Sequence, residues 1–244
     1  MKKELKRQIK EDEFISGIGR AWRWSSEHRR ELRSVALAVL AVAAIGIGLS
    51  WYQSSRDAAA RDAWAEALRT FHAPLESDLG ADAAPPSGPV FATPAERARK
   101  AMAAFDGFAR RFSRHELALR AEYYSGLCHI QLGELDQAEP LLSGVAARKD
   151  RGTVEPALAL VALASAYRSE GRYDDAVETW RRLLDDPGSP LPKDQALMQL
   201  AENLEQAERL PEARGYYERL SHEHPSSPHA AEARRRAGDL ERVG

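Results

Sequence analysis

The longest uncharged stretch of the sequence runs from Ser34 to Ser55, between Arg33 and Arg56. As a helix it is long enough to span a membrane, because about 20 residues cross the roughly 30 Å hydrocarbon core of a bilayer. Trp51 and Tyr52 follow its apolar part, and such rings favour the membrane–water boundary. The pattern therefore predicts one membrane-spanning helix at 34–55.

Two alternatives to a membrane anchor fit this stretch less well. A cleaved signal peptide has an apolar region of about 7–15 residues close to a short basic start, whereas this run begins 34 residues into the chain. A buried helix of a soluble domain would need a large apolar shell, and the polar, Arg-rich flanks do not supply one. We therefore expect an uncleaved single-pass anchor.

The basic residues near the span predict its orientation. Five arginines occur in residues 19–33 and two in residues 53–67. By the positive-inside rule, the tail of residues 1–33 lies in the cytoplasm and the body lies on the other side of the membrane. In a bacterium with two membranes, this predicts an inner-membrane protein with a periplasmic body.

The tail contains a short amphipathic pattern. Phe14, Ile18 and Trp22 recur at helical spacing and would share one face of a helix. This segment fits a helix lying along the membrane surface, and equally a loosely ordered tail tethered by its aromatic residues.

After the span, three segments of similar pattern follow one another. They cover residues 119–150, 157–188 and 194–225, and their anchor alanines are Ala138, Ala176 and Ala213. These alanines are 38 and 37 residues apart. Repetition at such a period indicates stacked supersecondary units that bury an apolar face only against their neighbours.

The positions within these segments resemble the tetratricopeptide repeat family, whose unit is a helix–turn–helix of about 34 residues. The second copy carries Leu163, Ala164, Tyr167, Gly171, Tyr173, Ala176 and Trp180 at the family's positions. The first copy keeps Gly126, Gly133, Ala138 and Leu142, and the third keeps Ala201, Leu204, Ala213, Tyr217 and Pro225. Glu208 stands where the third turn should have glycine, although Pro211 follows at the start of the next helix.

The resemblance predicts an all-α fold: a single transmembrane helix, then an α-solenoid of about three to four helical hairpins with a C-terminal capping helix. The expected divisions are a tail (1–33), the span (34–55), membrane-proximal helices with an incomplete first repeat (56–112), and the repeats with their cap (113–244). A mobile loop is expected at 76–93, which is rich in proline and glycine. We expect Arg56–Phe71 and Pro94–Phe112 to be the two helices of the incomplete repeat, Pro228–Leu240 to be the cap, and Pro140 to disturb its helix.

Charge and cysteine content exclude some functions. The chain carries 35 Lys+Arg and 37 Asp+Glu, and the excess of acidic groups falls in the body. Nucleic-acid binding would favour a basic body, so we exclude it. Cys128, the single cysteine, cannot form an intrachain disulfide and is expected to be a small core residue.

No pattern in the sequence indicates catalysis or a bound cofactor. His222, His224 and His229 are close in sequence but lie in a proline-broken stretch without the fixed spacing of metal ligands. Phosphate-binding glycine loops and nucleophile-elbow serines are absent. We therefore expect no enzyme activity, no metal, no cofactor and no small-molecule substrate.

The resemblance implies a groove built from the first helix of each pair. The positions that face it by the family's register are Arg120, Tyr123, Leu127, Leu158, Val161, Arg168, Gln195, Met198, Glu202 and Glu205. Such a mixed apolar and charged surface suits a helix or an extended peptide. Chaperone-binding family members clamp a terminal carboxylate with Lys and Asn, but Tyr123 and Leu127 occupy the matching positions, so that activity is not expected.

The layout as a whole is similar to membrane-anchored periplasmic repeat proteins, including the ancillary subunit of the bacterial Sec translocon. This implies protein partners: the translocon, periplasmic chaperones or exported chains. A structural scaffold of cell-envelope or cell-division complexes is the alternative. Within the span, the small residues Ala36, Ala43, Ala44 and Gly48 predict a face that packs against a partner's membrane helix.

Overall fold

The computed structural model describes residues 29–79, 88–148 and 153–243. The chain divides into two compact units, Met1–Ala59 and Ala60–Gly244. Regular structure in the described residues is helical throughout, apart from one isolated bridge between Leu75 and Phe91. The amphipathic pattern around Phe14, Ile18 and Trp22 lies outside the described residues.

Helix α2 (Arg29–Phe71) contains the predicted span and continues well beyond it. Within the described part of the chain, it is the one helix long and apolar enough to cross a membrane, by length and composition. A helix that faces lipid has exposed apolar side chains when the protein is considered without its membrane. The large apolar side chains of this stretch are all more than half exposed: Leu37, Val39, Leu40, Val42, Ile45, Ile47, Leu49, Trp51 and Tyr52. Among the described residues, none of these side chains is part of a protein core.

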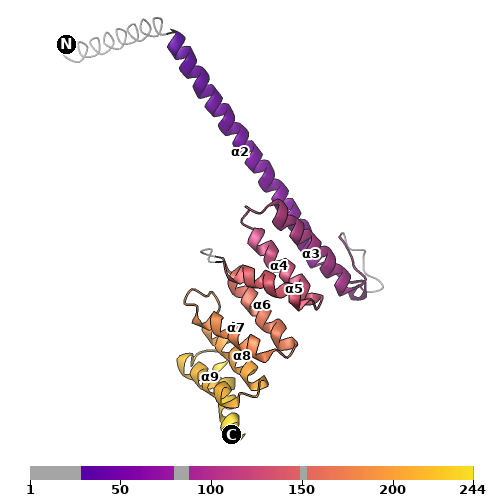
Figure 1. Cartoon of the computed structure of the whole chain (residues 1–244), viewed down its shortest axis with the longest axis vertical. Helices are drawn as coiled ribbons and strands as arrows, with labels where there is room; N and C mark the ends of the chain where they lie inside the picture. Colours follow the sequence, from indigo (N-terminus) through magenta and orange to yellow (C-terminus); the bar gives the residue numbers. More distant parts are fainter. Residues whose placement is uncertain (1–28, 80–87, 149–152, 244) are drawn as a thin grey trace, which may run out of the picture. The chain divides into compact units, whose positions relative to one another are not determined.

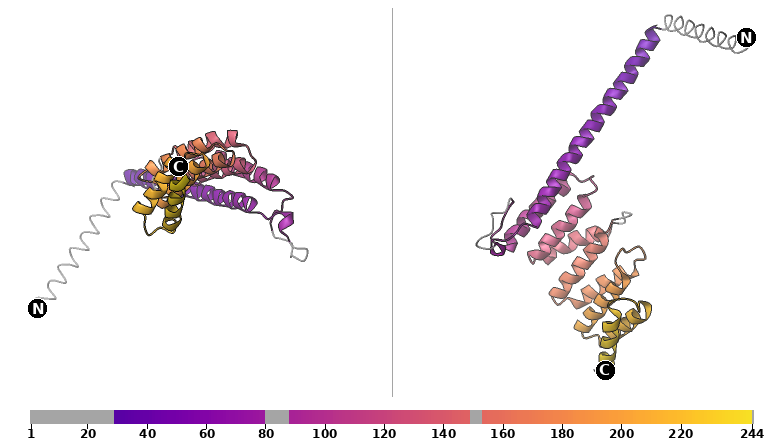
Figure 2. Two further views of the ribbon diagram at one scale, coloured as in Figure 1. Left: turned by 90° about the horizontal axis from the view of Figure 1, so that it is seen from below. Right: turned by 180° about the vertical axis from the view of Figure 1, so that it is seen from behind.

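The second unit is a row of antiparallel helices in which each helix packs against the next, and it confirms the predicted α-solenoid (Figures 1 and 2). After α2 come α3 (Pro94–Arg111), α4 (Ala118–Gln131), α5 (Leu135–Ala146), α6 (Glu155–Ser169), α7 (Tyr173–Asp185), α8 (Lys193–Gln206), α9 (Leu210–Glu223) and α10 (Ala230–Val243). The hairpins α4–α5, α6–α7 and α8–α9 correspond to the three repeated segments.

Small residues allow close contact between the two helices of a hairpin. Ala138, Ala176 and Ala213, the anchor alanines, are fully buried. Gly126 on α4 faces Leu142 on α5 so closely that a Cβ atom at Gly126 would lie 2.5 Å from the leucine Cδ2. The repeat period of the sequence therefore places small residues where helix axes approach most closely.

The turns between paired helices share one backbone conformation. Gly133 (φ 73°), Gly171 (φ 74°) and Glu208 (φ 58°) all have left-handed backbones at the same place in successive repeats. Only glycine adopts this conformation without steric cost. The third turn therefore has the same backbone conformation as the first two, although a glutamate stands where they have glycine.

The N-terminal part of this unit is held by aromatic contacts. Trp64, near the end of α2, lies 5.6 Å from both Phe105 and Phe108 of α3, centroid to centroid. Phe71 and Tyr124 join the same cluster. These rings connect the last turns of α2 to α3, and α3 packs against α4.

The loop at 76–93 and the helix that contains Pro140 were also predicted from the sequence. The described ends of the 76–93 loop are tied together, because the backbone N–H of Glu76 donates to the Phe91 carbonyl at 2.9 Å and Phe91 is buried. Residues 80–87 of that loop lie outside the described residues. Pro140 is an exposed residue inside α5, and the helix continues through it to Ala146.

The last helix, α10, covers the end of the final hairpin. Three alanines of α10 are buried in the same core cluster as residues of α8 and α9: Ala230, Ala233 and Ala237. The turn before α10 is held to α8 by a hydrogen bond of 2.6 Å from the Ser227 hydroxyl to the Asp194 carboxylate. The helix begins at Ala230, two residues later than predicted, and ends at Val243.

Candidate functional site

The residues predicted to face a groove come from three successive first helices. Arg120, Tyr123 and Leu127 lie on α4; Leu158, Val161 and Arg168 lie on α6; Gln195, Met198, Glu202 and Glu205 lie on α8. Nine of the ten are at least partly exposed, and Met198 is buried at 6% exposure in the core. Most of this set is therefore open to solvent, whereas Met198 contributes to packing in the core.

Polar contacts join these first helices to one another, beginning with α4 and α6. The Arg120 Nε donates to the Glu155 carboxylate at 2.6 Å, and the Glu155 side chain is almost fully buried. Burial by itself would raise the pKa of Glu155, but hydrogen bonds from Arg120 and from backbone N–H groups outweigh it, so that this pKa lies below its ordinary value. Glu155 is therefore an ionised carboxylate that depends on its arginine.

The next contact joins α6 to α8. The Arg168 guanidinium donates to Gln199 at 3.2 Å and lies 3.8 Å from the Glu202 carboxylate. Gln199 in turn donates to Glu202 at 3.0 Å. This brings together two of the predicted groove residues, Arg168 and Glu202.

The last contact of the series joins α8 to α10. Glu205 accepts hydrogen bonds from Arg236 at 3.1 Å and from the Tyr217 hydroxyl at 2.9 Å. Burial, and then the hydrogen bond to this carboxylate, raises the pKa of Tyr217, so the tyrosine stays protonated. We call the three connections Arg120–Glu155, Arg168–Glu202 and Glu205–Arg236 the charge ladder.

The remaining groove residues are mostly apolar. Tyr123, Leu127, Leu158 and Val161 are half-buried, so part of each side chain is open to solvent. Burial raises the pKa of Tyr123, which keeps its hydroxyl neutral. These four residues, two on α4 and two on α6, are here named the apolar strip.

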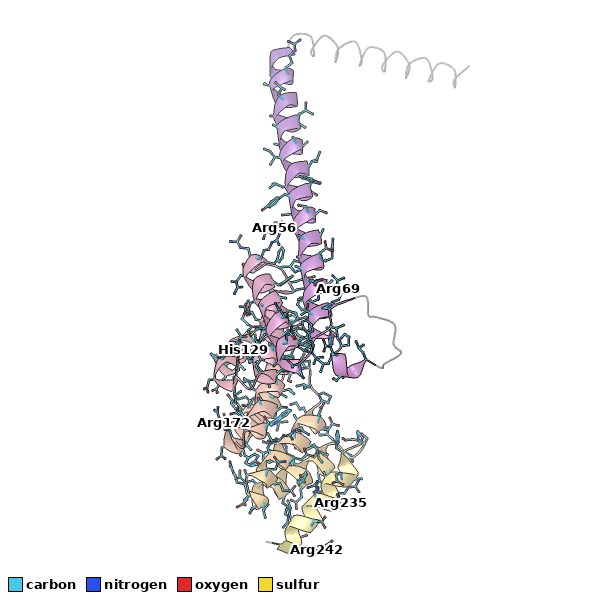
Figure 3. The ribbon with its side chains drawn as sticks, turned by 90° about the vertical axis from the view of Figure 1, so that its right-hand side faces the viewer. Arg56, Arg69, His129, Arg172, Arg235 and Arg242 are labelled. Carbon is cyan, nitrogen blue, oxygen red and sulfur yellow. The ribbon has the colours of Figure 1, made fainter. Side chains whose placement is uncertain are left out.

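A second series of ion pairs joins the second helices of the hairpins. Arg172, which precedes α7 and is labelled in Figure 3, pairs with Glu139 of α5 at 3.2 Å and stacks on Tyr167 at 4.4 Å. Arg209 occupies the same place before α9 and pairs with Asp174 of α7 at 2.9 Å. These pairs connect neighbouring repeats but are partly or, at Asp174, largely exposed. We therefore expect each to contribute less than about 1 kcal/mol.

Comparison with known proteins agrees with this geometry. Residues 161–228, which run from α6 to the turn before α10, match the tetratricopeptide repeat family. No curated protein sequence matches the chain.

Among solved structures, the chain is similar to a Podosopora anserina protein described as a kinesin light chain with nearly identical TPR-like repeats, at 15% identity and a TM-score of 0.48. That match covers 60% of this chain and 79% of the other. The MamA RS-1 ArsTM double mutant is similar at 14% identity and a TM-score of 0.42, with 61% of this chain and 87% of that one covered.

Among the described residues, no group of three or more His, Cys, Asp or Glu residues could hold a metal ion. Cys128 is buried, and burial raises the pKa of its thiol to about 12, which leaves it unreactive. A surface cleft of about 520 Å³ lies between α9 and α10, lined in part by Leu210, Pro211 and Leu240, and it includes none of the predicted groove residues.

The sequence reading missed the partners of the charged groove residues. Glu155, Gln199, Tyr217 and Arg236 complete the ladder, and each lies 12 to 35 residues from the residue that it contacts. A search for opposite charges about one repeat apart would have found Glu155 and Arg236. In the span, Ala43, Ala44 and Gly48 are exposed, and the side chain of Ala36 lies outside the described residues.

Proposed function

We propose that this chain is a membrane-tethered adaptor that binds a segment of another protein on the first-helix face of its repeats. The role is in protein translocation or envelope protein folding, with the N-terminus in the cytoplasm and the body in the periplasm. Its partners are the translocon, periplasmic chaperones or exported chains. The repeat array and the candidate membrane helix support a tethered protein-interaction module.

One observation carries this proposal: the apolar strip on α4 and α6 lies beside charges that are already paired. Tyr123, Leu127, Leu158 and Val161 remain partly open to solvent. Arg120 and Arg168 are bound to acidic groups of the neighbouring helix. A ligand that displaced these pairs would leave a buried carboxylate at Glu155 unpaired, which is costly. A partner with an apolar segment, such as one face of a helix, fits this surface better than a charged tail.

Tethering favours weak binding of this kind. A module held in the membrane beside its clients meets them at an effective concentration of about millimolar order. Modest affinity for unfolded or apolar segments is then sufficient, and release stays fast.

Crosslinking in native membranes, followed by affinity purification of the full chain and mass spectrometry, tests the proposal. We expect translocon, chaperone or exported proteins, and we expect Leu127→Ser with Leu158→Ser to reduce their recovery. The matched control is Glu178→Ser with Arg182→Ser on exposed positions of α7, which should not reduce it. If the recovered proteins were only cell-division or peptidoglycan components, this would contradict the translocation role and support the scaffold alternative. Equal recovery from both double variants would contradict the use of the strip.

A further inference from the structure

Three arginines gather at the turn between α3 and α4 without acidic partners. Arg110, Arg111 and Arg114 are exposed, and none of them takes part in an ion pair among the described residues. Arg111 stacks on the ring of Phe112 at 5.0 Å. Glu116 is the only acidic residue between Arg110 and Arg120. We call these three residues the basic turn.

The basic turn contrasts with most of the arginines farther along the repeats. The following seven each lie within 3.2 Å of a carboxylate: Arg172, Arg181, Arg209, Arg214, Arg219, Arg235 and Arg236. Ion pairs within a helix or between neighbouring helices therefore account for those residues, whereas no such pair in the described part of the chain accounts for the basic turn. An exposed cluster of one sign fits an oppositely charged surface.

The position of the turn within the second unit indicates which surface that is. Helices α2 and α3 run antiparallel in this unit, because Arg97 near the start of α3 donates to the Ala73 carbonyl at 3.0 Å while Trp64 contacts Phe108. The C-terminal end of α3 therefore lies beside the point where the chain enters the unit at Ala60 (Figure 1). The basic turn consists of the last two residues of α3, Arg110 and Arg111, and of Arg114 just after them.

Chain length limits how far this point can be from the membrane. Ser55 ends the predicted span, and Ala60 follows five residues later. Five residues extend over at most about 18 Å even when fully extended, and over about 7–8 Å as a helix. This limit holds for any relative orientation of the two units. If α2 spans the bilayer up to Ser55, Ala60 lies within about 18 Å of the end of the span, and the basic turn lies on the side of the second unit where the chain enters it.

We propose that Arg110, Arg111 and Arg114 bind the anionic lipid headgroups of the membrane in which α2 is anchored, and so orient the repeats against it. The inference rests on the membrane anchor of the proposed function but not on the apolar strip. Each arginine near an anionic surface raises the equilibrium constant for the membrane-bound orientation about fivefold. At physiological salt, this electrostatic attraction is screened beyond about 8 Å. Contact with the bilayer therefore depends on both lipid charge and ionic strength.

Energy transfer in reconstituted bilayers tests this inference with the full chain. A donor dye is attached at Ser113→Cys, which is exposed, while the buried Cys128 stays unlabelled; the acceptor is carried by lipid headgroups. We expect higher transfer in nanodiscs with anionic lipid than in neutral ones, and loss of that difference at about 1 M salt, where screening acts within about 3 Å. A donor at the remote Ser226→Cys should show no such difference.

Charge variants complete the test. Arg110→Gln with Arg111→Gln and Arg114→Gln should lower transfer in anionic nanodiscs to its level in neutral ones. The control, Arg99→Gln with Arg182→Gln and Arg234→Gln, removes the same charge from other exposed positions and should leave transfer unchanged. Equal transfer in anionic and neutral bilayers, or an unchanged triple variant of the basic turn, would overturn the inference. If alkaline carbonate extracted the wild-type chain from membranes, this would instead contradict the proposal that α2 is a membrane anchor.

Discussion

Gly126 lies so close to Leu142 that the space between α4 and α5 holds no side chain at position 126. A Cβ atom there would lie 2.5 Å from Cδ2 and 2.6 Å from Cγ of a leucine that is fully buried. Because Cγ is not the flexible end of the side chain, the leucine cannot give way without moving its helix.

Gly126→Ala should therefore destabilise the repeats by about 1–2 kcal/mol, since overpacking outweighs the gain in helix propensity. Urea denaturation of the detergent-solubilised chain, followed by tryptophan fluorescence, measures the change. Gly144→Ala is the control, because a Cβ atom at the exposed Gly144 meets nothing within 4 Å. Gly144→Ala should stabilise the protein by about 0.5–1 kcal/mol. A similar decrease in the free energy of unfolding in both variants would contradict the close-contact explanation.

The turn at Glu208 carries backbone strain that its two counterparts avoid. Glu208→Gly should raise the free energy of unfolding by about 1 kcal/mol. The variant removes the cost of a left-handed backbone at a non-glycine residue, about 1–2 kcal/mol. Part of this gain is lost because the unfolded chain has more conformational entropy with glycine. The reciprocal variant Gly171→Glu should lower the free energy of unfolding by a similar amount, since a Cβ at Gly171 has open space and only the backbone conformation (φ 74°) opposes it. No change in either variant would show that these turns relax without cost.

These turns also show what the sequence could predict. The period of Ala138, Ala176 and Ala213 indicated the hairpins, because small residues recur wherever paired helices touch. Gly133 and Gly171 indicated two turns by residue type alone. Glu208 obscured the third turn, because the packing of α8 against α9 imposes its backbone despite the residue present.

The charge ladder was beyond a reading of single positions. The resemblance to the repeat family was enough to name Arg120, Arg168 and Glu202 as residues predicted to face a groove. Their state depends on side chains about one repeat away, and Glu155 at the start of α6 looked like an ordinary first-turn acid. Whether a surface charge is free or paired is decided by stacking between repeats, which a local pattern does not contain.

Arg120→Gln should destabilise the protein at neutral pH by about 1–2 kcal/mol, because the carboxylate of Glu155 would lose its charged partner while remaining buried. Since the pKa of Glu155 is lowered in the folded protein, its stabilisation is present above the ordinary value of 4.5 and is lost as pH falls through the lowered pKa. The difference between wild type and variant should thus be largest near pH 7 and shrink below about pH 4. A difference that stays constant with pH would contradict this pairing; Arg182→Gln, at an exposed position, is the control.

Within the span, Ala44→Leu with Gly48→Leu should reduce co-purification of a membrane partner while leaving the chain inserted. A Cβ atom at Gly48 meets nothing within 4 Å of the protein itself, so a loss of binding would report a contact outside the chain. Small residues permit such close helix contacts in lipid. Leu40→Ala with Leu49→Ala, which changes other exposed positions of the span, is the control. Unchanged recovery of the partner in the leucine variant would leave α2 as a tether only.

Site-specific photocrosslinking in native membranes tests the central claim most directly. A photoreactive amino acid is placed in the full chain at Leu127 or Leu158 of the apolar strip, or at Glu178 or Arg182 on exposed positions of α7. The account predicts protein adducts from the two strip positions and none above background from the two α7 positions. Adducts from α7 alone, or equal adducts from all four positions, would contradict binding at the first-helix face.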